Sequence, residues 1–248
     1  VEGKGVTLAE IGHPLWSSNF TGVIQDNATL VGAAGDVTIG SNNLGTIGFH
    51  AANTYTGDTI VNGGTLSLNN VNALQNSTLN TGSSGAQQVA FNVGGANTYN
   101  IGGLKGADDL AIGSNTISVG SNNSSNTYSG VISGTDGALI KVGSGTQILT
   151  SANTYTGTTT VSNGTLFVNG DQTSATGATT VENGGAFGGS GTIGGTLTLD
   201  AGANFVFSLT DTLTTVGAVS FGGFSIANVV GLDETAANGI YTLIDGST

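Results

Sequence analysis

Few residues in this sequence could do chemistry. Its 248 residues include 15 acidic side chains, two histidines (His13 and His50) and three lysines, with no arginine and no cysteine. Acidic neighbours occur at Asp108-Asp109 and Asp233-Glu234, and two carboxylates can hydrolyse a glycosidic bond when they flank it. Neighbours in a strand point to opposite faces. We therefore expect neither pair to form a shared site.

Three further motifs are explained by local structure. Residues 189–194 read Gly-Ser-Gly-Thr-Ile-Gly, but a dinucleotide fingerprint requires a helix after it, and strand-like residues 195–199 follow. Residues 102–108 come nearest to a calcium-binding β-roll repeat, yet they occur once and include a lysine. His13 and His50 are the two histidines, and the sequence contains no serine nucleophile motif for either of them to activate. We expect no enzyme activity, no catalytic residue, no cofactor and no metal.

Composition excludes several classes of partner. Only 7% of the residues are charged and the formal net charge is −12, which disfavours nucleic acid and anionic surfaces. Without arginine there is no bidentate phosphate clamp, and without cysteine there is no disulfide framework. No apolar run approaches the ~18 residues of a membrane span. We expect no membrane insertion by this chain.

Internal repeats indicate the elements that position these residues. Residues 51–69 and 151–169 are identical at most positions, and aromatic-x-Gly-Val-Ile recurs at 20–24 and 128–132. Asn-Thr-Tyr occurs four times, at spacings typical of a unit of 20 to 30 residues. We expect its members to form a structural ladder, although the tyrosines could instead stack on carbohydrate. The ladder residues are Asn53, Tyr55, Asn97, Tyr99, Asn126, Tyr128, Asn153 and Tyr155.

Each unit alternates apolar and small polar residues with period two, which is typical of short strands. This alternation predicts Thr65, Ser67 and Thr165 outside, and these side chains inside: Val61, Leu66, Leu68, Val161, Leu166 and Val168. A sandwich needs no long-range period, whereas stacked coils do. The sequence therefore predicts an all-β parallel β-helix (β-solenoid), a single elongated domain roughly 50 Å long.

The repeats also resemble a known family. Residues 127–170 resemble the autotransporter-associated β-strand repeat, residues 99–130 are similar to the segment that flanks it, and residues 192–248 resemble the end of a passenger module. The resemblance implies a right-handed parallel β-helix. It also implies an extracellular or cell-surface location in a secreted bacterial protein.

We expect an N-terminal cap or inter-subunit arm at 1–17, solenoid repeats at 18–199 and C-terminal coils or a cap at 200–248. Open strand edges template pairing, so we predict head-to-tail association of the chain with itself, as an oligomer or filament. The residues expected to mediate it are Leu8, Ile11, Pro14, Leu15, Trp16, Ile240, Tyr241, Leu243 and Ile244.

The predicted function is a non-enzymatic extracellular structural β-solenoid, either a surface stalk or a self-assembling fibre subunit. The alternative is an adhesin or glycan-binding passenger module that contacts surface glycans. A polysaccharide-active enzyme is the more distant alternative.

Overall fold

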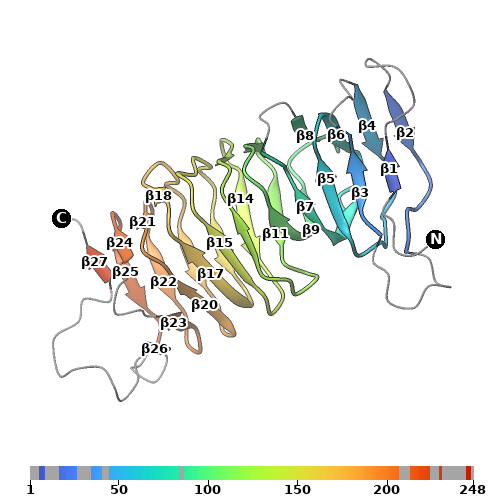
Figure 1. The fold of residues 1–248 in the computed structure, drawn as a ribbon. Coiled ribbons are helices and arrows are strands. Elements are labelled where there is room, and N and C mark those ends of the chain that lie inside the picture. Colours follow the sequence, from blue (N-terminus) through green and yellow to red (C-terminus); the bar gives the residue numbers. More distant parts are fainter. Residues whose placement is uncertain are drawn as a thin grey trace.

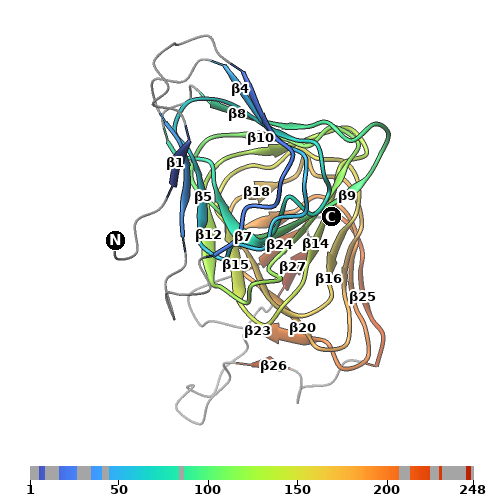
Figure 2. The same ribbon diagram turned by 90° about the vertical axis from the view of Figure 1, so that its right-hand side faces the viewer.

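The chain folds into a parallel β-solenoid whose coils stack along one axis (Figures 1 and 2). The computed structural model describes residues 6–8, 17–26, 35–40, 45–83, 87–206, 213–223, 229–230 and 244–246. Within these ranges the regular elements are strands, and every strand pair is parallel. No helix among these residues is long and apolar enough to cross a membrane. The predicted all-β solenoid is therefore confirmed.

One long sheet follows the whole stack. Its eleven strands, at ~4.8 Å spacing, span roughly 50 Å, with β1 and β25 at its two edges. In order they are β1 (Val6–Leu8), β3 (Val37–Ile39), β5 (Asp58–Val61), β7 (Leu74–Asn80), β9 (Thr98–Lys105), β11 (Thr116–Val119), β14 (Ala138–Lys141), β16 (Thr159–Val161), β19 (Thr179–Val181), β22 (Leu197–Leu199) and β25 (Val219–Phe221).

Four smaller sheets complete the coils. The N-terminal second sheet contains β2 (Ser18–Phe20), β4 (Thr46–Phe49), β6 (Gly64–Leu68) and β8 (Gln87–Phe91). The C-terminal second sheet contains β12 (Asn126–Tyr128), β15 (Thr146–Leu149), β17 (Gly164–Val168), β20 (Gly185–Gly188), β23 (Asn204–Val206) and β26 (Val229–Val230). The short pair is β10 (Leu110–Ala111) with β13 (Ile132–Ser133), and the third sheet holds β18 (Asp171–Gln172), β21 (Thr192–Ile193), β24 (Leu213–Thr215) and β27 (Ile244–Gly246).

The core forms because alternating residues of each strand face the inside of the coil. All six residues predicted to point inward, Val61, Leu66, Leu68, Val161, Leu166 and Val168, are at most 3% exposed, which confirms the predicted register. Thr65 and Thr165 are half-buried on the outer side. Ser67, also predicted on the outer side, is only 3% exposed. The amides of Asn69 and Asn92 cover it and donate to its hydroxyl, at 2.9 and 2.5 Å.

Glycine at one corner lets successive coils approach closely. A glycine shortly before a strand of the long sheet, as in the two Asn-Thr-Tyr-Thr-Gly segments, stacks on the carbonyl group of the matching glycine one coil earlier. A Cβ there would overlap that carbonyl oxygen, so only glycine fits. The stacked residues are Gly137, Gly157, Gly177, Gly195 and Gly217, and Gly57 stacks on Gly35 in the same way.

The stack is interrupted at β9. The first half of this strand pairs with β11, where Tyr99 lies opposite Ile117, and its second half pairs with β7, where Leu104 lies opposite Leu79. The β7–β9 register shifts between the two halves. Beyond β9, Gly106 bridges Tyr128 of β12, the first strand of the C-terminal second sheet. Here the N-terminal second sheet ends at β8 and two new sheets begin, so we call this region the junction.

Strand pairing crosses both predicted segment boundaries. β1 pairs with β3, so residues 6–8 belong to the long sheet. At the other boundary, β22 pairs with β25 and β20 pairs with β23, across residue 199. β1 and β2 lie at one end of the stack and β27 at the other (Figure 1).

Candidate functional site

A cavity of about 570 Å³ lies at the junction. It is lined by Gln88 and Val89 of β8, by Ala107, Asp108, Asp109 and Ala111 around β10, and by Ser133 of β13. No strand pairs with β8 on the side away from β6 among the described residues. The hollow therefore occupies the step where one stack of strands ends and another begins.

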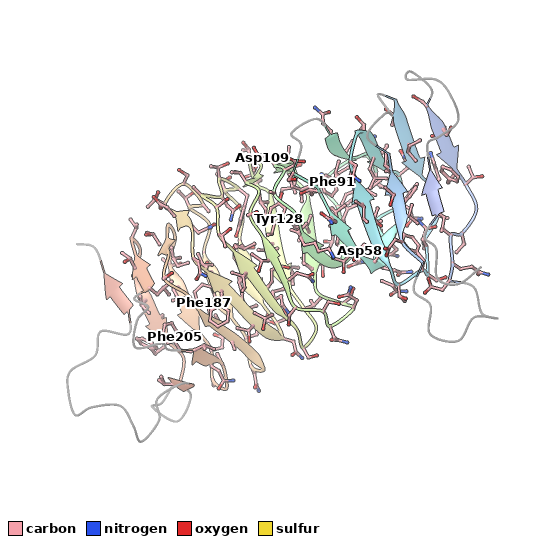
Figure 3. The ribbon with its side chains drawn as sticks, viewed as in Figure 1. Asp58, Phe91, Asp109, Tyr128, Phe187 and Phe205 are labelled. Carbon is pink, nitrogen blue, oxygen red and sulfur yellow. The ribbon has the colours of Figure 1, made fainter. Side chains whose placement is uncertain are left out.

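Asp108 and Asp109 both line this cavity, although the sequence placed neighbouring acidic residues on opposite faces. The expectation assumed a strand, where neighbours alternate. The two residues instead lie in a bend between β9 and β10, where alternation does not hold. Figure 3 shows Asp109 near Phe91 and Tyr128, on the side of the molecule where β8 ends.

The backbone around the two carboxylates is held from neighbouring coils. The Tyr128 hydroxyl donates to the carbonyl oxygen of Asp108 at 2.7 Å, and Thr81 Oγ1 donates to the same oxygen at 3.0 Å. Asp109 Oδ1 accepts the backbone N–H of Val131 at 2.8 Å. Leu110 N–H donates to the Val131 carbonyl at 2.8 Å. The backbone that carries the two carboxylates is therefore held in place by hydrogen bonds from neighbouring coils.

The predicted ladder residues do not occupy equivalent positions in successive coils. Asn53-Tyr55 and Asn153-Tyr155 occupy the corner before β5 and β16, respectively. Tyr99 lies in β9 of the long sheet, and Tyr128 lies in β12 of the C-terminal second sheet. The tripeptide recurs, but the junction places its copies on different faces of the solenoid.

At the shared corner, the two repeat themes interlock. Asn53 Oδ1 accepts the N–H of Ile24 at 2.9 Å, and Asn153 Oδ1 accepts the N–H of Ile132 at 2.7 Å. Both isoleucines end the aromatic-x-Gly-Val-Ile segment of the preceding coil. Asn53 also donates from Nδ2 to the carbonyl of Ala73 in the next coil at 3.0 Å. This asparagine links three coils.

Asn97 and Asn126, the other two repeat asparagines, bond differently. Asn97 Nδ2 donates to the carbonyls of Val93, Gly94 and Gly95, each at 3.0 Å, and so closes the turn before β9. Asn126 pairs with Gln147 in the C-terminal second sheet. Neither residue makes the contact to the preceding coil that Asn53 makes.

The repeat tyrosines point inward and are at most 3% exposed. The Tyr55 hydroxyl bonds Thr59, and Tyr155 bonds Thr159 at 2.6 Å. Burial raises the pKa of Tyr55 and of Tyr155 to about 12, against a partial lowering by these threonine hydroxyls. Tyr99 packs edge-on against Phe91, with ring centroids 4.8 Å apart, and accepts the N–H of Val93 at 2.7 Å. Buried rings of this kind cannot form a surface that stacks on sugars.

Lys141 is buried inside the coil at 1% exposure. It lies opposite Val119 and Val161 in the long sheet. Its Nζ donates to the carbonyl oxygens of Val142, Gly143 and Asn163, at 2.6, 2.9 and 3.2 Å. Burial lowers the pKa of its ammonium group to about 8. Because its partners are corner carbonyls of two successive coils, Lys141 fastens the turn.

The other chemical motifs lie as follows. His50 is exposed next to β4, whereas His13, Asp233 and Glu234 lie outside the described residues. Residues 189–194 connect β20 to β22 through β21, with strands on both sides. In the part of the chain that the structure describes, no three His, Cys, Asp or Glu side chains gather into a group that could hold a metal ion.

Two of the residues predicted to mediate self-association have a described backbone. Leu8 ends β1, and Ile244 begins β27, where it pairs with Leu213. Ile11, Pro14, Leu15, Trp16, Ile240, Tyr241 and Leu243 lie outside the described residues.

Sequence reasoning missed the cavity and the burial of Lys141. The alternation of residues 138–141 placed Lys141 on the inner face, so its burial had a signal in the sequence. The cavity had none, because Gln88, Asp109 and Ser133 meet only through the change of pairing at β9.

Comparison with known proteins agrees with this architecture. The model of the passenger-associated-transport-repeat family matches residues 44–68 and 139–168. The chain is also 41% identical over 122 residues to the adhesin BmaC autotransporter of Brucella suis biovar 1 (strain 1330). The aligned region is 49% of this chain, and it spans only 3% of that protein. No solved structure matches the chain. The resemblance stated from the sequence is therefore confirmed: the chain is a parallel β-solenoid, and two of its segments match the passenger-associated-transport repeat.

Proposed function

We propose that this chain is a surface-exposed segment of an adhesin passenger, and that it acts by contact rather than by catalysis. The observation that carries this proposal is its 41% identity to part of an autotransporter adhesin, together with two matched passenger repeats in a solenoid. The proposal favours the adhesin alternative over a purely structural stalk.

The construction of the coils supports a contact role. Each coil encloses apolar ladders and turns small polar side chains outward, as in β16, where Thr160 lies between buried Thr159 and Val161. A solenoid of this kind offers an extended surface on rigid strands. With three lysines and no arginine, the chain has few cationic groups to attract an anionic partner, so binding rests on hydrogen bonds and shape.

A bead assay tests the adhesin role. The full chain, coupled to inert beads, should hold the beads on cultured epithelial cells, and soluble chain should compete them off. Beads that carry an unrelated acidic protein of similar size serve as the control. Incubation of the chain with polysaccharides should release no product. Beads that bind no better than the control would refute the adhesin role, and product release would favour the enzyme alternative.

Self-association is a second proposal, favoured by the exposed end of the long sheet. Phe221 ends β25, the last strand of the long sheet among the described residues, and is 53% exposed; Val216, in the bend before β25, is 49% exposed. Exposed apolar side chains of this size favour association with another chain. Sedimentation of the full chain over a range of concentrations tests this, with monomer at every concentration as the contrary result.

A further inference from the structure

The structure assigns a ligand site to the junction cavity. We propose that the cavity lined by Gln88, Asp108, Asp109 and Ser133 binds a non-anionic glycan, one or two sugar units at a time. The inference rests on the proposed adhesin role, because it names the chemistry through which such a passenger would make contact. It concerns a place in the fold rather than a repeat motif.

Size is the first argument. A volume of about 570 Å³ falls within the range of roughly 300–1,000 Å³ that is usual for small-ligand pockets. A calcium ion needs six to eight oxygen ligands at close range. The described part of the chain holds no cluster of three carboxylate, histidine or cysteine side chains. The space therefore suits an organic molecule better than a bare ion.

The chemistry of the lining is the second argument. Two carboxylates accept hydrogen bonds, the Gln88 amide both donates and accepts, and Ser133 offers a hydroxyl. Val89 and the two alanines supply small apolar patches between these groups. A sugar presents hydroxyl donors and acceptors together with C–H faces, so it can satisfy both kinds of lining.

Charge decides which sugars fit. Among the described residues that line it, two side chains are acidic and none is basic. Lys105, the lysine nearest in sequence, is committed to Asp58, with Nζ and Oδ2 2.5 Å apart. A carboxylated, sulfated or phosphorylated ligand would enter without a counter-charge, which costs free energy. Neutral and amino sugars remain.

Rigidity and available backbone groups are the third argument. The bonds from Tyr128, Thr81 and Val131 fix the carboxylate-bearing bend before any ligand arrives, and pre-organisation lowers the entropy cost of binding. On the other wall, β8 has no strand partner on its free side among the described residues. Its backbone can add donors and acceptors where Gln88 and Val89 line the hollow.

Position in the stack is the fourth argument. Within the described residues, the long sheet continues past the junction without a break, from β14 through β16 and β19 to β22. The cavity exists because β9 shifts the pairing between the two matched repeat segments. A regular solenoid would close this step, so the interruption provides a recess between the two stacks of strands.

Titration of the ¹⁵N-labelled full chain by NMR tests the site, with chitotriose as neutral probe, glucosamine trimer as cationic probe and 3′-sialyllactose as anionic probe. We expect amide shifts at residues 88–89, 107–111 and 133 with the neutral or the cationic probe, and none with the anionic one. The arm that responds identifies the sugar class. Shifts with calcium chloride alone, or with an extended peptide in place of sugar, would overturn the assignment.

Variants locate the binding. Asp109→Asn keeps the shape and an acceptor for Val131 N–H, and should weaken glycan binding roughly tenfold or more through loss of a charged acceptor. Ala111→Leu narrows the cavity without removing a polar group and should abolish binding. Asp136→Asn, in an exposed turn outside the cavity, is the matched control and should bind as the wild type does. Unchanged affinity of Ala111→Leu in a chain with wild-type circular dichroism would refute the site.

The two proposals fail in different ways. If wild-type beads adhere to cells and Asp109→Asn beads adhere equally well, the adhesin role survives and the cavity is not its contact. If chitotriose or glucosamine trimer binds in the cavity and wild-type beads do not adhere, the glycan site stands and the adhesin role fails.

Discussion

Replacing Lys141 with methionine should remove one specific pH dependence of stability. In the folded chain the ammonium group is buried, and its pKa falls from the ordinary 10.5 to about 8. Burial thus penalises the charged form of Lys141 in the folded state only. Below pH 8 both folded and unfolded chains carry the proton, and the penalty is present in full.

Between pH 8 and 10.5 the folded chain loses this proton before the unfolded chain does. Because the unfolded state then binds more protons, the free energy of unfolding rises with pH. The shift from 10.5 to about 8 corresponds to about 3 kcal/mol at its full extent. Above pH 10 the tyrosines act in the opposite direction. Tyr55 and Tyr155, with pKa raised to about 12, keep their protons only when folded, so stability falls there.

Denaturant unfolding at pH 7, 8, 9 and 10, followed by circular dichroism, measures this effect. The wild type should gain up to about 3 kcal/mol relative to Lys141→Met across this range, because the tyrosine contributions are common to both chains and cancel. Lys105→Met removes a surface lysine and should keep the wild-type alkaline rise. Parallel profiles for wild type and Lys141→Met would refute the reasoning.

Three further predictions concern the ladders and the open edge. Leu166→Ala should lower the free energy of unfolding in denaturant by ~2 to 5 kcal/mol, since its side chain is 0% exposed. The control Thr165→Ala, at its outward neighbour, should lower it by less than ~1 kcal/mol. Equal losses in the two variants would contradict the register. Asn153→Ala should cost roughly 1 to 3 kcal/mol, because it leaves the Ile132 N–H without its acceptor, and exposed Thr154→Ala should be near neutral by thermal melting. Phe221→Ser should lower any concentration-dependent sedimentation of the chain, and oligomers unchanged by it would place the contact elsewhere.

Period and alternation were enough to predict which side chains fill the core. Leu166 and Val161 recur 100 residues after Leu66 and Val61, and all four side chains are 0% exposed. This succeeded because like residues stack on like in a solenoid, and a slip by one residue would expose the whole set. The burial of Ser67 could not be predicted in this way, because it is covered by the side chains of Asn69 and Asn92, which lie outside its own strand.

The site could not be predicted in the same way. Sequence period describes how one coil resembles the next, whereas the cavity arises where pairing changes. The eight-residue strand β9 serves two neighbours at different registers, and nothing in Thr98–Lys105 itself states which half pairs with which strand. Only the assembled pairs bring Gln88 and Asp109, 21 positions apart, to the same hollow.

An interruption in a stack of this kind has an energetic consequence that bears on its purpose. Each strand that ends without a partner leaves backbone groups that must find water or a ligand, so a strictly regular solenoid would be expected to eliminate such a step. Here the step is reinforced instead. The Tyr128 hydroxyl and Thr81 hold the Asp108 carbonyl, Val131 holds Asp109, and Lys105 bonds Asp58 across the β7–β9 shift. The junction therefore combines a recess, exposed backbone groups of β8 and a fixed pair of carboxylates, and it is where the proposed glycan binding should be sought.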